Sequence, residues 1–84
     1  MRYNDQWVFR NIHGYNILIN TLDNSILSIS FVVAEIFEMI NNKEQEDALE
    51  TILLSWKNKN NISEEKQIDS IIEYFVNKGV FINE

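Results

Sequence analysis

The chain contains one histidine and no cysteine, so few of its residues could do covalent or acid–base chemistry. His13 precedes Gly14 in a predicted turn, with no cysteine partner and no serine in a recognisable nucleophile motif. A solvated turn histidine is the better interpretation of that position. Only two glycines are present, Gly14 and Gly79, which is too few for a loop that cradles phosphate. The inventory therefore predicts a protein that is not an enzyme and has no cofactor.

Two acidic clusters have side chains that a hard cation could use. One comprises Glu44, Glu46 and Asp47, and the other comprises Glu64 and Glu65. Both stand where a helix is predicted to begin, and carboxylates are favoured there because they complement the positive end of the helix dipole. We therefore interpret both clusters as helix starts and predict no metal site.

Composition limits the classes of partner. The 84 residues are enough for one domain, residues 1–84, with a modest core. The net charge of −6 argues against binding to a phosphate backbone, so no nucleic-acid partner is expected. No apolar run is long enough to span a membrane, and the N-terminus lacks the apolar segment of a signal peptide. We expect a cytoplasmic protein without a membrane partner.

The first third of the chain has the period-two alternation of β-strands. Three segments rich in strand-forming residues are predicted strands: residues 7–12, 15–20 and 25–29. His13-Gly14 and Asp23-Asn24 are residue types that close tight turns. Short strands joined by tight turns predict an antiparallel meander with one face more covered than the other.

The rest of the chain has the period of α-helices, predicted at about residues 31–41, 43–57 and 64–78. The first helix has one apolar stripe: Val33, Ile36, Phe37 and Ile40. Ser30 is a natural N-cap for it, and Gly79 is suited to end the last helix in a left-handed conformation. Trp7 and Trp56 are expected in the core or at its edge. The fold class predicted is α+β and winged-helix-like, a three-stranded antiparallel sheet followed by three helices.

This order of elements resembles the PqqD-like domains, also called RiPP recognition elements. The family has a characteristic strand-to-helix junction, which stands here as Leu27-Ser28-Ile29-Ser30. The helix after it carries Ala34, Ile36 and Phe37, and the chain ends in the glycine-aliphatic tail Lys78-Gly79-Val80-Phe81-Ile82. The last helix has the family's aspartate and hydrophobic ladder at Ile68, Asp69, Ile72 and Phe75. The resemblance covers about four-fifths of the chain.

The resemblance implies a function. PqqD-like domains bind the leader region of a ribosomally made precursor peptide and present it to a modifying enzyme or a leader protease. The leader adds as a further strand to the edge of the third strand, and its side chains lie against the third helix. The residues that would then bind peptide are Ser25, Ile26, Leu27, Ser28, Ile29, Lys66, Gln67, Ser70, Ile71 and Tyr74.

The third strand is compatible with strand addition. Residues 25–29 contain no charge, proline or glycine, whereas idle sheet edges are commonly protected by lysine or proline. Two alternatives stay open for this edge: cover by the N-terminal segment, or pairing with a second copy in a homodimer. Tyr74 likewise has two interpretations, as a contact for a bound peptide or as a ring that covers its own helix.

A different class of binding domain is the main alternative. Three helices and a small sheet also describe a winged-helix module, which binds protein partners or reads DNA through one helix. A DNA-reading helix should be basic. The predicted last helix is not, because Glu64, Glu65, Asp69 and Glu73 outnumber Lys66 and Lys78. A small partner protein that works by shape alone is a third candidate.

Overall fold

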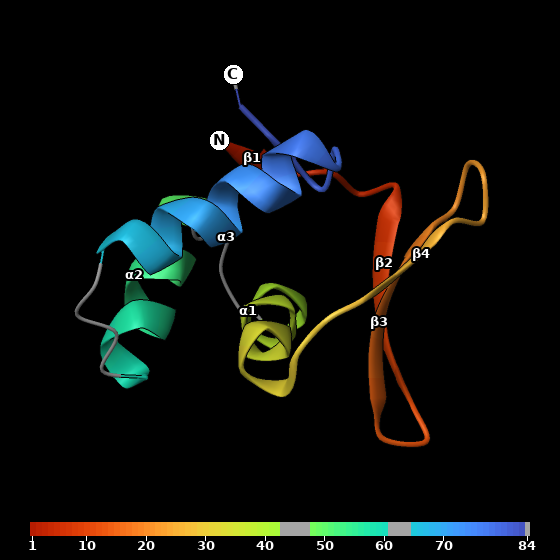
Figure 1. The fold of residues 1–84 in the computed structure, drawn as a ribbon, viewed down its shortest axis with the longest axis horizontal. Coiled ribbons are helices and arrows are strands. Elements are labelled where there is room, and N and C mark those ends of the chain that lie inside the picture. Colours follow the sequence, from red (N-terminus) through yellow and green to blue (C-terminus); the bar gives the residue numbers. More distant parts are fainter. Residues whose placement is uncertain (43–47, 61–64, 84) are drawn as a thin grey trace. The chain divides into compact units, whose positions relative to one another are not determined.

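The computed structural model describes residues 1–42, 48–60 and 65–83, without the side chains of residues 65 and 66. The elements are β1 (Arg2–Tyr3), β2 (Trp7–Ile12), β3 (Tyr15–Asn20), β4 (Ile26–Ser28), α1 (Phe31–Asn41), α2 (Leu49–Lys59), α3 (Glu65–Asn77) and β5 (Phe81–Ile82) (Figure 1). Strands β2, β3 and β4 form one antiparallel sheet, and three helices follow them. The predicted α+β fold class is confirmed.

The chain divides into two compact units. Residues 5–43 form the first, here called the sheet unit, and residues 1–4 with 44–84 form the second, here called the helical unit. Each is described by itself below.

The sheet unit is built on a tight hairpin. β2 and β3 pair from Trp7 opposite Asn20 to Ile12 opposite Tyr15. His13 and Gly14 connect them with φ values of +51° and +84°. Positive φ at both turn residues is the type I′ geometry, whose twist matches that of the flanking strands. The predicted turn is confirmed.

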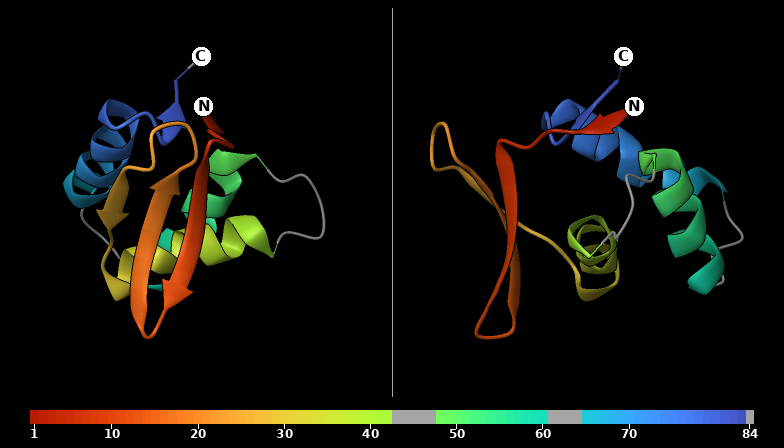
Figure 2. Two further views of the ribbon diagram at one scale, coloured as in Figure 1. Left: turned by 90° about the vertical axis from the view of Figure 1, so that its right-hand side faces the viewer. Right: turned by 180° about the vertical axis from the view of Figure 1, so that it is seen from behind.

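The sheet has an inner face, which packs on α1, and an outer face. The inner face includes the buried side chains Trp7, Phe9 and Leu18. The ring of Phe9 stacks on that of Phe37 in α1, with the centroids 6.0 Å apart. Figure 2 (left) shows the sheet in front of α1. The buried residues of α1 are Ala34, Ile36, Phe37 and Ile40, so the predicted stripe is confirmed except at Val33, which is half-buried.

The chain passes from sheet to helix with almost no connection. β4 ends at Ser28 and α1 begins at Phe31. Ser30 is the N-cap residue, and its hydroxyl oxygen accepts a hydrogen bond from the backbone N–H of Val33 over 3.3 Å. A side-chain cap of this kind satisfies a backbone donor that the first helical turn leaves without a partner. The predicted cap is confirmed.

The helical unit contains a second, two-stranded sheet that the sequence did not predict. β1 and β5 pair antiparallel, with Arg2 opposite Ile82 and Tyr3 opposite Phe81 (Figure 2). Asn4 extends the contact, because its backbone N–H donates to the carbonyl of Val80 over 2.8 Å. The prediction of three strands was therefore incomplete.

The end of α3 explains how β5 reaches its place. The N–H of Gly79 donates to Val76 and the N–H of Val80 donates to Phe75, the two hydrogen bonds of a Schellman motif. Gly79 has a φ of +78°, as that motif requires. The chain then returns to the core, where Val80 and Phe81 are buried. The predicted glycine cap is confirmed.

The predicted bounds of α2 were wrong. Ala48 is extended and precedes the helix, and the helix continues to Lys59 rather than ending at residue 57. The lysines extend it because cations are favoured in a last helical turn. Trp56 is buried, as expected. The predicted helix-start residues lie outside the described residues or have undescribed side chains: Glu44, Glu46, Asp47, Glu64 and Glu65.

Candidate functional site

Strand β4 lies at an edge of the three-stranded sheet, whose strand order is β2-β3-β4. The carbonyl of Ser25 accepts from Asn20 over 2.9 Å, and the N–H of Ile29 donates to Asn16 over 3.0 Å. Hydrogen-bonded and non-bonded pairs alternate along an antiparallel ladder. The backbone groups of Ile26 and Ser28 therefore point away from β3.

The predicted third strand, residues 25–29, is slightly longer than β4, which spans Ile26–Ser28. The two flanking residues nevertheless bond to β3 through their backbones. Pairing thus covers the predicted range, although only its centre has strand geometry.

The turn before β4 is held by a carboxylate. Asp23 Oδ1 accepts hydrogen bonds from the Ser25 hydroxyl over 2.7 Å and from the Ser25 backbone N–H over 2.9 Å. These two hydrogen bonds hold the pKa of Asp23 below its ordinary value. The bond from the Ser25 hydroxyl has the larger effect, and the bond from the Ser25 backbone N–H has the next largest. Asn24 turns the chain with a φ of +62°. The turn predicted at Asp23-Asn24 is therefore confirmed, and the Asp23 carboxylate holds it to Ser25.

The opposite edge of the sheet, β2, differs in charge. Arg10 Nη1 donates to the backbone carbonyl of Phe9 over 2.8 Å. Residues 25–30, which include β4, carry no charged side chain. Charged side chains on an edge discourage pairing with other chains. Of the two edges, β4 is the one without that protection.

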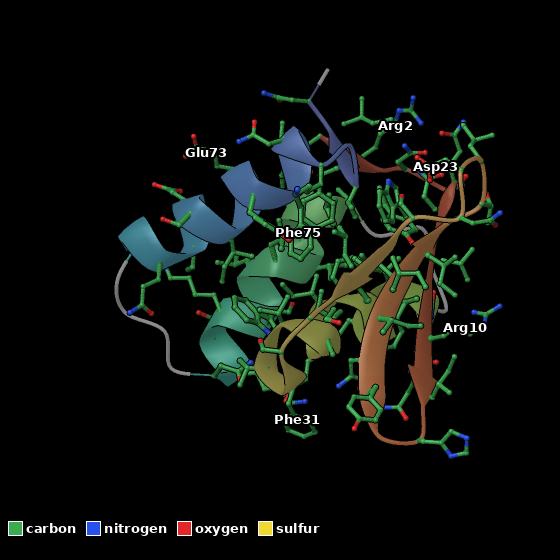
Figure 3. All side chains as sticks on the ribbon, turned by 45° about the vertical axis from the view of Figure 1, so that its right-hand side comes forward. Arg2, Arg10, Asp23, Phe31, Glu73 and Phe75 are labelled. Atoms are coloured by element: carbon green, nitrogen blue, oxygen red, sulfur yellow. The ribbon has the colours of Figure 1, made fainter. Side chains whose placement is uncertain are left out.

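Apolar side chains near β4 are exposed. Ile26 is 59% exposed and Leu27 is half-buried. Phe31, at the start of α1, is 77% exposed and projects from the first turn (Figure 3). Phe31 was not among the predicted site residues, although its place directly after the predicted Ser30 cap was visible in the sequence.

The outer face of the sheet is also largely apolar. Its described residues are Val8, Arg10, Ile12, Tyr15, Ile17, Ile19, Ile26 and Ser28, as the pairing register requires. Tyr15 is 75% exposed and Ile12 is 46% exposed. The alternation of residues 15–20 was visible in the sequence, but it did not reveal which face would be covered.

The helix half of the predicted site belongs to the helical unit. Gln67, Ser70, Ile71 and Tyr74 share one side of α3, because they recur at helical spacing. Gln67 and Ser70 are exposed and Ile71 is half-buried. Lys66 is on the same helix, and its side chain is not described. The strand half and the helix half thus fall in different units, and the groove between them stays a prediction.

Tyr74 interacts with its own helix. It is 45% exposed, its ring meets that of Phe75 edge-on at 5.2 Å, and Lys78 Nζ lies 5.8 Å from its centroid. A cation over an aromatic face attracts its quadrupole. The ring therefore packs on its own helix and is still partly exposed, and its contact with a bound peptide stays a prediction.

A cavity of about 290 Å³ lies between α2 and α3 in the helical unit. Its lining residues are Met1, Glu50, Leu53, Leu54, Lys57, Ile68, Asp69 and Ile72. Glu50 accepts from the Met1 amine over 3.0 Å, and this hydrogen bond lowers the pKa of its carboxyl. None of the predicted site residues with a described side chain lines the cavity, and no motif in the sequence pointed to it.

Within residues 1–42, 48–60 and 65–83, no group of three or more His, Asp or Glu side chains is placed to hold a metal ion. His13 is exposed in its turn. Among the described helices, none is long and apolar enough to cross a membrane.

Comparison with protein-family models, with curated proteins and with solved structures finds no match for this chain. The protein is therefore classified by its fold alone. It is an α+β chain in which an antiparallel three-stranded sheet precedes three helices.

Proposed function

We propose that this protein binds the leader region of a ribosomally synthesised precursor peptide and delivers it to a modifying enzyme or a leader protease. The leader adds to β4 as a fourth strand of the sheet. Backbone hydrogen bonds then supply affinity, and side-chain contacts supply selectivity. The proposal combines the resemblance of the sequence to PqqD-like domains with the form of the β4 edge.

One observation carries the proposal. Ile26 and Ser28 direct their N–H and carbonyl groups away from β3 at an edge without charge. An unprotected edge of this kind is a template for another strand. The other edge, β2, has Arg10 bound to the carbonyl of Phe9. This difference favours β4 as the docking edge.

The N-terminal residues are engaged elsewhere. Arg2 and Tyr3 pair with Ile82 and Phe81 within the helical unit. This pairing argues against the alternative in which the N-terminal segment covers the β4 edge. A second copy of the chain is another competitor for the edge.

The resemblance to PqqD-like domains implies a second contact for the peptide, on the exposed side of α3 in the helical unit. Gln67 and Ser70 offer polar groups, whereas Ile71 and Tyr74 offer apolar surface to a peptide. Lys66 would add a positive charge on the same helix. The partner enzyme receives the bound leader, and this work takes place in the cytoplasm, where precursor peptides are made.

The test uses fluorescein-labelled leader peptides from precursors encoded next to this chain. Anisotropy is the suitable signal because Trp7 and Trp56 are buried and would report poorly on a surface event. Amide exchange monitored by NMR should show protection of Ile26 and Ser28 when peptide is added. Duplex DNA is the control, and DNA binding that weakens steeply with salt would favour the winged-helix alternative. Leader binding without protection at β4 would contradict the docking edge.

A further inference from the structure

Two rows of side chains run across the sheet and end at the β4 edge. The inner row consists of Phe9, Leu18 and Leu27, and the outer row consists of Val8, Ile19 and Ile26. Residues directly opposite one another in an antiparallel sheet place their side chains on the same face. Each row is apolar from β2 to β4, so each ends at β4 with an apolar side chain.

In both rows the residue on β4 is the most exposed. In the inner row, Phe9 and Leu18 are buried, whereas Leu27 is half-buried. In the outer row, Val8 and Ile19 are half-buried, whereas Ile26 is 59% exposed. Leu27 and Ile26 have a cross-strand neighbour in β3 and, within the described sheet, lack a second one on the other side. A further strand would supply that neighbour on both faces.

The next row along the strands, beyond the inner row, ends differently. Arg10, Ile17 and Ser28 form a second outer-face row, which reaches the edge with a hydroxyl. Ser28 is exposed. A small polar residue is the complementary neighbour, because Thr and Ser side chains pair by hydrogen bonding across strands.

The hydrogen-bond alternation fixes how a guest strand would sit. Ile26 and Ser28 would exchange backbone hydrogen bonds with their opposite residues, and Leu27 would face its guest residue in a non-bonded pair with Cα atoms about 4.5 Å apart. The guest should run antiparallel to β4, because the sheet is antiparallel throughout and such pairing is slightly more stable per residue.

We infer that the β4 edge selects peptides with the order small polar, apolar, apolar, read from the N-terminus of the guest. The first residue lies beside Ser28, the second covers Leu27 on the inner face, and the third covers Ile26 on the outer face. The outer face of the sheet is thereby a specificity surface. This inference rests on the proposed function, because it describes the guest of the same edge.

A random dodecapeptide display library, selected on the immobilised full chain, tests the inference. Enriched peptides should share the order small polar, apolar, apolar. Replacing the third residue by aspartate in an enriched peptide should weaken binding by up to about fivefold, since a cross-strand pair contributes up to about 1 kcal/mol. Ile26→Ser should abolish the preference at that residue. Leu22→Ser, at another exposed apolar position in the preceding turn, should leave it unchanged.

Amide exchange of the protein, measured with the enriched peptides bound, distinguishes failure of this inference from failure of the proposed function. Protection of Ile26 and Ser28 by peptides that lack the order, or that show the reverse order, overturns this inference and leaves strand addition standing. A selection that yields no peptide protecting these amides overturns the proposed function and the inference together. Unaltered preference in Ile26→Ser also overturns the inference, because the outer row would then have no part in selection.

Discussion

Arg10 Nη1 donates to the carbonyl oxygen of Phe9, its neighbour in the chain, over 2.8 Å. Thr21 donates to Gln6 at the end of the same ladder, so the alternation turns the carbonyl of Phe9 away from β3. At the β2 edge, the outward-facing carbonyl of Phe9 therefore already accepts a hydrogen bond from a charged side chain of the same strand. β4, at the other edge, has no charged residue.

Arg10→Met should open the β2 edge. Methionine keeps an apolar stem but removes the charge and the donor to Phe9, so the variant should self-associate more than the parent as concentration rises. Sedimentation velocity would measure this. Lys78→Met makes the same change in net charge in the helical unit and should behave like the parent. Equal sedimentation of Arg10→Met and the parent would show that Arg10 does not protect the edge.

Proline substitutions should distinguish the outward and inward amides of β4. Ile26→Pro and Ser28→Pro remove N–H groups that point away from β3, so they should weaken leader binding by roughly tenfold and leave the fold intact. Leu27→Pro removes an N–H that faces β3 and should lower the thermal midpoint. Anisotropy titration and thermal unfolding would measure the two effects. Unchanged affinity in both outward variants would exclude this edge as the docking site.

The turn at Asp23 should make the stability of the sheet unit depend on pH. Its pKa is lowered in the folded state by the hydrogen bonds from Ser25, so its contribution is present above the ordinary aspartate pKa. That contribution is lost as the pH falls through the lower folded pKa, below about pH 4. The difference in thermal midpoint between the parent and Asp23→Ala should therefore shrink in acid. A difference that grew in acid would contradict this assignment.

Gly79 should tolerate a side chain poorly because of its backbone conformation alone. An added Cβ would meet no atom within 4 Å, yet φ is +78°. Gly79→Ala should therefore cost about 1–2 kcal/mol in the free energy of unfolding, the usual penalty for an L-residue in the left-handed region. Gly79→Asn should cost less, because asparagine tolerates that region better. Denaturant unfolding would measure both, and equal costs would point to another cause.

Substitutions on α3 should test the helix half of the site. Tyr74→Ala and Ile71→Asp should weaken leader binding more than Glu73→Ala, which alters an exposed residue on another side of the same helix. Glu50 would be a poor control because it binds the Met1 amine. Anisotropy titration would rank the variants. Equal losses in all three would indicate general destabilisation of α3.

Local signals predicted most of the fold. The hairpin turn, the Ser30 cap and the Gly79 cap each depend on residues within a few positions of one another, and all three are confirmed. The β1–β5 sheet joins the two ends of the chain, and beside it the Asn4 side chain donates to the carbonyl of Gly79, 75 positions away. Each of its strands has two residues, too few to show a period.

The candidate site was predictable in part for the same reason. The absence of charge in residues 25–29 identified the β4 edge, but which amides point outward depends on the register with β3. Residues 15–20 alternate between Tyr-Ile-Ile and Asn-Leu-Asn faces, and composition favours burial of the first. The structure buries Leu18 instead, because it lies between Phe9 and Leu27 on the face that packs on α1. Pairing partners, and not composition, decided the covered face.

The β1–β5 pairing makes the helical unit discontinuous along the chain, with residues 5–43 inserted between its two segments. Because Arg2 is opposite Ile82, a short linker could join the two chain ends, and the chain could be reopened between residues 43 and 44. In such a circular permutant each unit would be one uninterrupted segment. Either half could then be expressed alone, so that the contribution of each to peptide capture could be assigned separately.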